Sequence, residues 1–297
     1  MPSIVIFYHP GSENVISADI LSKGVFPWNK EAHHRKFLEA EGAYVTNESN
    51  SPQTAKLRFW GEWEPCSHVR KLQGKSPRYL HTPFVKRPLP ALPKTASTGN
   101  VRCGVKVGCG SNLQNTDPFV FAESFYYGIC QQITKKGNST GMQKLEKGSI
   151  ILFGSRVNKE FALDTVFIVG DRRPYTTDNI LSDLSSFVPS DYPNLMQFNK
   201  EHSLVCYKGA NFLNPMNGMY SFVPCRISDG GDTGFERPTI SPCDFQSCQL
   251  ERIMPDGPKN QGRKVTEVTI EDCQKVWNSV RNAIHAQDYL EGFNFKY

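Results

Sequence analysis

The sequence predicts an α+β fold, with a mixed or mostly antiparallel sheet or a small barrel, an N-terminal helix and a C-terminal amphipathic helix. Short apolar runs bounded by turn residues recur along the chain, which is typical of strands. Patterns typical of a helix occur near both ends. With 38% hydrophobic and 11% aromatic residues, the chain of 297 residues is too apolar to be disordered and long enough to bury a core.

The N-terminal part contains three predicted elements. Residues 3–8 form an apolar run, which predicts a buried strand, and His9-Pro10-Gly11-Ser12 would end it. Residues 29–41 predict a helix, for which Gly42 is a natural stop. Residues 56–64 alternate in polarity, which predicts a strand with two different faces.

The C-terminal part contains most of the predicted strands. The aromatic range 119–131 predicts a strand, with a short helix as the alternative. Further strands are predicted over 148–153, 161–169, 204–207 and 220–223. Because 161–169 is apolar on both faces, we expect it to be central in a sheet.

The last predicted element is an amphipathic helix over residues 270–290. Thr269 followed by Asp272 is typical of a helix N-cap. The apolar residues of the range recur at helical spacing and form one stripe, which consists of Ile270, Cys273, Val276, Val280 and Ile284 and is widened by Trp277.

Composition changes along the chain divide it into three ranges. Residues 1–81 form an N-terminal α/β part that includes the Trp-Gly-Glu-Trp-Glu strand. Residues 82–99 form a Pro-rich basic connector or arm, and residues 100–297 form a β-rich domain with the C-terminal helix. The alternative is one continuous domain.

The first residues and the cysteines predict a soluble, cytoplasmic protein. No basic region precedes the short apolar run at the start, so we expect no secretory signal, and no run is long enough for a membrane span. Nine cysteines are an odd number for a complete disulfide framework. Cys243 and Cys248 just fit the spacing of paired zinc ligands, whereas Cys103 and Cys109 do not. We therefore expect neither metal nor cofactor.

The net charge of +5 is unevenly distributed. Residues 65–116, here called the basic segment, contain nine Lys and Arg and no Asp or Glu, so the remainder of the chain has a net charge of −4. Aromatic and proline residues lie among the cations. This pattern suits an arm that contacts a phosphate backbone and stacks on bases, or a solvated loop that packs on the acidic remainder. The candidate phosphate-binding residues are Arg70, Lys71, Lys75, Arg78, Lys86 and Arg87.

The string from Trp60 to Glu64 is a candidate catalytic strand. Glu62 and Glu64 fall on one face of a strand, roughly 7 Å apart, which suits a general acid and base or two ligands of a divalent cation. Trp60 shares their face and could stack on a base or sugar. The alternative is an exposed face whose glutamates pair with Arg58 or with the basic segment.

Asp164 is the third candidate catalytic carboxylate. It lies in the middle of the apolar range 161–169, where a charge is costly unless it is paired or hydrogen-bonded. Asp164 is therefore either a structural residue with a partner or a polar group placed in a pocket.

Ser124, Tyr126 and Tyr127 are candidate ligand-binding residues. Aromatic faces can stack on a base, and hydroxyl groups can read its edge. The alternative is that this aromatic cluster belongs to the core.

Lys144 to Ser155, with the sequence Lys-Leu-Glu-Lys-Gly-Ser-Ile-Ile-Leu-Phe-Gly-Ser, precedes the strand predicted over 161–169. This arrangement, within residues 119–170, resembles the strand and return strand of PUA-like domains, which include the ASCH and EVE groups. Those domains are small β-barrels that bind RNA or modified bases. The resemblance implies that Phe153, Asp164 and Tyr126 lie near a barrel pocket.

Three functional hypotheses follow. The first is a nucleic-acid or nucleotide binding module, in which an aromatic pocket reads a base and the basic segment holds phosphates. The second is an enzyme acting on nucleotides or nucleic acid, with Glu62, Glu64 and Asp164 as acid/base or metal-binding carboxylates. The third is a protein-interaction subunit that docks through its Pro-rich arm.

Overall fold

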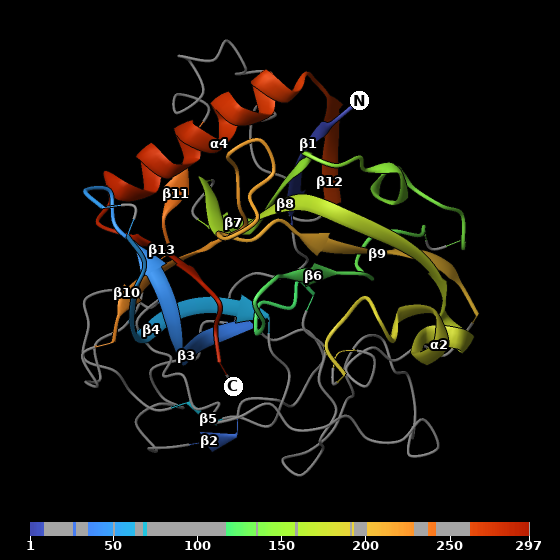
Figure 1. Ribbon diagram of the computed structural model, residues 1–297, viewed down its shortest axis with the longest axis horizontal. Coiled ribbons are helices and arrows are strands. Elements are labelled where there is room, and N and C mark those ends of the chain that lie inside the picture. Colours follow the sequence, from blue (N-terminus) through green and yellow to red (C-terminus); the bar gives the residue numbers. More distant parts are fainter. Residues whose placement is uncertain are drawn as a thin grey trace.

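In the described part of the chain, β-structure predominates in this computed structural model, as one mixed sheet and one closed barrel (Figure 1). The basic segment lies outside the described residues, apart from residues 68–69. The structure describes residues 1–8, 26–27, 35–49, 51–62, 68–69, 117–134, 136–157, 160–190, 192, 201–228, 237–241 and 262–296.

The mixed sheet has seven strands that come from both ends of the chain. Their order is β12-β1-β7-β8-β9-β6, and β11 also pairs with β8. β1 runs parallel to β7, whereas the other neighbouring strands are antiparallel. The strands are β1 (Ser3–Tyr8), β6 (Tyr126–Tyr127), β7 (Ile150–Val157), β8 (Glu160–Thr176), β9 (Ser203–Gly209), β11 (Thr239–Ile240) and β12 (Gly262–Glu267).

The closed barrel has four antiparallel strands in the order β10-β13-β3-β4. Its strands also come from both ends of the chain: β3 (Arg35–Val45), β4 (Gln53–Glu62), β10 (Val223–Ile227) and β13 (Leu290–Phe293). The rings of Phe59 and Phe295 lie 4.3 Å apart. A Cβ on Gly292 would meet Cys225 and Phe295 at 2.8 Å, so side chains fill the space beside this strand. Separately, β2 (Phe26–Pro27) pairs with β5 (His68–Val69).

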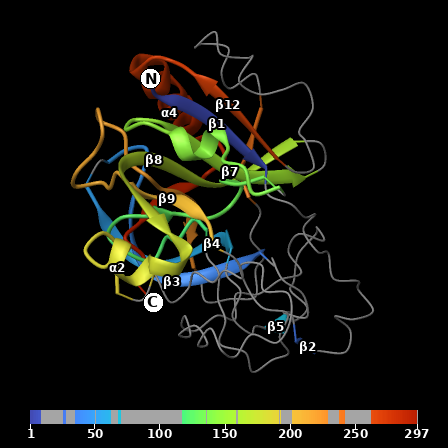
Figure 2. The same cartoon turned by 90° about the vertical axis from the view of Figure 1, so that its right-hand side faces the viewer.

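The sheet buries both of its faces. Ile4, Ile6 and Ile150 belong to one core cluster with the buried side of α4 (Ile270–His285), which lies along the sheet (Figure 2). Val5 and Phe7 belong to a second cluster on the opposite face, with the aromatic residues that follow residue 117. The remaining described helices are short: α2 (Ile180–Leu184), η3 (Gly141–Lys144) and η4 (Thr177–Asn179).

The prediction of an α+β fold with an N-terminal helix is wrong, because the described chain is mostly β and its only α-helices are α2 and α4, neither of which belongs to the N-terminal part. Residues 35–41 of the predicted helix belong to β3, which hydrogen-bonds to β4 and β13. Gly42 lies within this strand and does not end a helix. Pairing of residues 35–41 with the next strand, β4, therefore overrides the local helical pattern.

The C-terminal helix is confirmed. Thr269 and Asp272 form a reciprocal capping box, and the helix ends at His285 because the chain then turns into β13 at Leu290. The strands predicted over 3–8, 148–153, 161–169 and 204–207 correspond to β1, β7, β8 and β9. β8 lies between β7 and β9, as its two apolar faces predict.

Two predicted strands are shorter in the structure than in the prediction. Within 119–131, only Tyr126–Tyr127 is a strand, and most of the remainder forms bends and turns. Within 220–223, only Val223 belongs to β10. Strands from residues 1–81 and from residues 100–297 pair with each other in both the sheet and the barrel.

Candidate functional site

Asp164 lies at a β-bulge between β7 and β8. Phe153 pairs with Thr165, whereas the next residue, Gly154, pairs with Leu163. Asp164 is therefore an extra residue on β8 that has no opposite residue on β7. A bulge of this kind turns a side chain out of the regular alternation of the strand.

The Asp164 carboxylate forms a buried ion pair with Arg237. The Nη1 group of Arg237 donates to Oδ1 of Asp164 and, at 2.8 Å, to Oγ of Ser155. The guanidinium carbon also lies 4.6 Å from the centre of the Trp60 ring. Asp164 is 5% exposed and Arg237 is 4% exposed. These four side chains form what is here called the Asp164 cluster.

The Asp164 cluster joins the barrel to the sheet. Trp60 comes from the barrel strand β4, whereas Asp164 and Ser155 come from the sheet strands β8 and β7. The negative charge of Asp164 is balanced by the positive charge of Arg237, and both groups are buried. The carboxylate is therefore part of an ion pair in the protein interior. Trp60 is 3% exposed, and the Arg237 guanidinium lies over its ring. This geometry fits a structural Asp with a partner.

The other two candidate carboxylates are only partly placed. Glu62 is the last residue of β4 and pairs with Arg35 of β3. Its side chain, Glu64 and all six candidate phosphate-binding cations lie outside the described residues. The structure therefore brings Trp60 and Asp164 together through Arg237, whereas the side chains of Glu62, Glu64 and the six cations are not placed.

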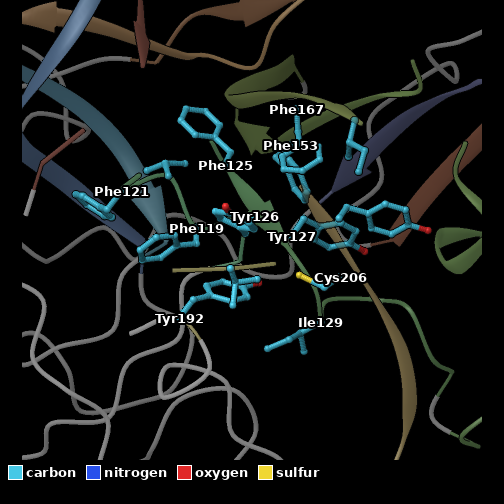
Figure 3. Packing of buried hydrophobic residues seen from close by; sticks show 14 of the residues in the cluster. Phe119, Phe121, Phe125, Tyr126, Tyr127, Ile129, Phe153, Phe167, Tyr192 and Cys206 are labelled. Atoms are coloured by element: carbon cyan, nitrogen blue, oxygen red, sulfur yellow. The ribbon is translucent and has the colours of Figure 1, made fainter. Parts of the chain in front are cut away.

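Tyr126 and Tyr127 lie inside the aromatic core (Figure 3). The Tyr127 ring stacks on Tyr207 with centres 5.8 Å apart, and its hydroxyl donates to the carbonyl of Cys130. Tyr126 packs against Tyr192 with ring centres 5.4 Å apart. Burial raises the pKa of Tyr126 to about 12 and that of Tyr127 well above its usual value. Both phenols are therefore neutral groups of the protein interior at physiological pH.

Ser124 is also buried and hydrogen-bonded. It is 3% exposed, and its Oγ accepts a hydrogen bond of 3.0 Å from Nδ2 of Asn211. The same Asn211 amide lies 3.4 Å from the carboxylate of Glu123. Ser124 therefore fixes a surface loop to the strand region beside it.

Described residues on either side of the basic segment meet in the core. Asp117, directly after the segment, is fully buried and accepts hydrogen bonds from the backbone N–H groups of residues 128, 129 and 130. Phe121 follows it, and the centre of its ring lies 6.1 Å from that of Phe59 on β4, the strand that precedes the segment.

A second buried charge network was missed by the sequence reasoning. Glu291 of β13 is fully buried and accepts hydrogen bonds from Tyr220 and, at 2.6 Å, from Nε of Arg281. Nε2 of His285 lies 2.6 Å from the same carboxylate. Arg281 and His285 lie four residues apart on α4, a spacing that places both on one helix face and could have indicated a shared partner.

Arg237 was also missed. It lies 73 residues from Asp164 in the sequence, directly before β11 and in no periodic pattern, so the sequence contains no signal for their contact.

The strands that carry the resemblance to PUA-like domains belong to the seven-stranded sheet, and the closed barrel is built from other strands. Phe153 and Tyr126 share one core cluster, whereas Asp164 lies in the separate cluster around Arg237. The candidate zinc ligands lie outside the described residues. Within the described ranges, no group of three or more His, Cys, Asp or Glu is placed to hold a metal ion.

No described helix has both the length and the apolar character needed to cross a membrane. No protein-family model, curated protein or solved structure matches this chain.

Proposed function

We propose that this protein binds nucleic acid or nucleotides and that its basic segment contacts the phosphate groups. The observation that carries the proposal is the charge distribution. Nine Lys and Arg without one Asp or Glu occupy residues 65–116, in a chain whose remainder has a net charge of −4. A cationic stretch of this kind gains affinity for a phosphate backbone by releasing its condensed counterions.

The described residues that flank the basic segment belong to the folded core, which supports the proposal. Asp117, directly after the segment, is held by three backbone N–H groups, and Phe121 packs beside Phe59 of β4, the strand before the segment. In the proposal, a segment joined on both sides to the folded body has less conformational freedom than a free tail of equal length. Binding therefore orders less chain than a tail would require.

The aromatic residues of the folded body that were candidates for stacking on a base are buried. Trp60, Tyr126 and Tyr127 are at most 5% exposed. In the proposal, the aromatic residues of the basic segment, Tyr79 and Phe84, stack on bases while the cations around them contact phosphates. The resemblance of residues 119–170 to PUA-like domains, which bind RNA or modified bases, agrees with this class of ligand but does not include Tyr79 or Phe84.

The proposal includes a cytoplasmic location. Cys206, Cys225 and Cys273 are free thiols in the described part of the chain, which agrees with a reducing compartment. A protein partner docked through residues 82–99 is the competing proposal.

The test is binding of labelled single- and double-stranded DNA and RNA at several salt concentrations. The variant replaces Arg70, Lys71, Lys75 and Arg78 with Ala. Each lost phosphate contact lowers the slope of log affinity against log salt by about 0.7 to 0.9, so the full change is about 3 to 4. A matched control removes four exposed lysines of the folded body: Lys136, Lys144, Lys275 and Lys296.

Loss of affinity and of salt dependence in the segment variant, with little change in the control, supports the proposal. Equal losses in both variants would mean that only the net charge matters, which contradicts a phosphate contact by this segment. If the unmodified protein binds none of the four nucleic acids and no free nucleotide, the proposal is overturned in favour of the protein partner.

A further inference from the structure

β12 lies at one end of the seven-stranded sheet. Within the described part of the chain, it pairs with β1 alone. The other end of the sheet differs, because Phe119 exchanges two backbone hydrogen bonds of 2.7 and 2.8 Å with Tyr126 of β6. β12 is thus the edge of the described sheet at which a further strand can add.

The register shows which backbone groups of β12 point outward. The Val268 N–H donates to the Pro2 carbonyl at 3.1 Å, and this pair continues the register between β1 and β12. In an antiparallel ladder, hydrogen-bonded pairs alternate with pairs whose N–H and C=O groups point away from each other. The N–H and C=O groups of Arg263, Val265 and Glu267 therefore point away from β1.

These three residues are complementary to a second copy of themselves. Arg263 and Glu267 lie two residues before and after Val265, which is 37% exposed. When two β12 strands run antiparallel with Val265 opposite Val265, each Arg263 lies opposite the Glu267 of the other copy. The three outward-facing pairs then form six backbone hydrogen bonds and two ion pairs between opposite charges.

Two symmetric alternatives are unfavourable. A register with Arg263 on the two-fold axis places two guanidinium groups opposite each other, and a register centred on Glu267 places two carboxylates opposite each other. Like charges directly opposite each other destabilise a strand pair. The charge pattern of β12 thus favours the register that is centred on Val265 over these two.

We propose that β12 pairs with β12 of a second copy of this chain, which joins two seven-stranded sheets into a symmetric dimer. The proposal does not depend on the proposed function. Nη1 of Arg263 donates to Oε1 of Gln131 at 3.1 Å. The guanidinium has five N–H donors, so this contact leaves donors for the Glu267 of the other copy.

The first experiment measures the mass of the full-length chain by light scattering or sedimentation over a wide concentration range. A dimer that dissociates on dilution is expected, because a pairing of six-residue strands is a small interface. Arg263→Glu or Glu267→Arg alone converts two attractive pairs into repulsive ones and should weaken dimerisation roughly tenfold or more. The two substitutions together restore opposite charges and should restore the dimer. Lys264→Glu is the matched control, because it makes the same charge change as Arg263→Glu opposite the uncharged Thr266.

A backbone substitution separates dimerisation from folding. Val265→Pro removes an outward N–H group and should abolish the dimer while the chain remains folded, because proline is tolerated at an outward-facing edge position. Thr266→Pro removes an N–H group that points to β1 and should lower the thermal stability instead.

A monomer at every concentration would overturn the proposal. A dimer that persists in Val265→Pro and in both charge reversals would overturn it as well, since the interface would then lie elsewhere. If a charge reversal unfolds the chain, the Val265→Pro result decides the question.

Discussion

Replacing Asp164 with Asn tests whether the Asp164 cluster holds the barrel to the sheet. The substitution leaves Arg237, which is 4% exposed, without its compensating charge. Removing one partner of a buried ion pair costs about 3 to 5 kcal/mol. Arg237 keeps its bond of 2.8 Å to Ser155, and the uncharged Asn oxygen can still accept a hydrogen bond from Arg237, which offsets about 1 kcal/mol of this cost. The expected loss in the free energy of unfolding is therefore about 2 to 4 kcal/mol.

The assay is urea unfolding followed by tryptophan fluorescence, because Trp60 belongs to the cluster. Arg237→Met and the double variant complete a double-mutant cycle. The double variant contains neither buried charge, so it should lose less stability than the two single variants combined, with a coupling of about 1 to 3 kcal/mol. Asp178→Asn, at an exposed position, is the matched control and should change stability by less than about 0.5 kcal/mol.

A loss below about 1 kcal/mol for Asp164→Asn, or strict additivity in the cycle, would refute the reasoning, since a buried and coupled pair cannot behave in that way. The same variant also addresses function. If Asp164 only supports the fold, binding of nucleic acid at temperatures where the variant is folded should not change. Loss of binding by a folded variant would place the carboxylate at the ligand.

Three further predictions concern a buried carboxylate, a buried phenol and a helix cap. Glu291→Gln removes the negative charge that Arg281 and His285 share, so the free energy of unfolding should fall by about 3 kcal/mol in urea titrations, whereas Glu201→Gln, at an exposed position, should have little effect. Burial raises the pKa of Tyr8 to about 12 from 10.0. Between these pH values the unfolded state releases a proton that the folded state keeps, so stability should fall with a slope of about 1.4 kcal/mol per pH unit for this residue. Tyr8→Phe should make that decline less steep without loss of stability at pH 7, because its buried hydroxyl has no hydrogen-bond partner among the described residues; an unchanged slope would contradict the assignment. Thr269→Ala removes the helix N-cap and should cost about 1 kcal/mol, seen as a lower Tm, and an unchanged Tm would show that the capping box contributes nothing.

The elements that the sequence predicted correctly are those with strong local signals. β1 and β7 are apolar runs, β8 is apolar on both faces, and α4 has a cap followed by a regular apolar stripe. Each signal lies within the element itself, so no knowledge of distant strands was needed.

The prediction of an N-terminal helix was wrong because its range is rich in residues that favour helices, whereas the structure pairs the range with the next strand. Residues 35–41 contain Lys, Leu, Glu and Ala, yet they pair with β4. The glycine at position 42 is explained by a tertiary contact, since a Cβ there would meet the Phe295 ring at 2.8 Å. Gly42 and Phe295 are so far apart in the sequence that their contact leaves no mark in a local pattern.

In the candidate site, too, the sequence contains the composition but not the tertiary contacts. Whether Asp164 is paired or available depends on Arg237, and whether Tyr126 can stack on a ligand depends on Tyr192, which already packs on its ring. A single sequence contains neither fact. The charge of the basic segment, in contrast, is a property of composition, and it does not change with the fold. The salt dependence of binding measures that charge directly. It can therefore test the proposed function without a position for any side chain of the segment, whereas a catalytic role for Glu62 or Glu64 first requires one.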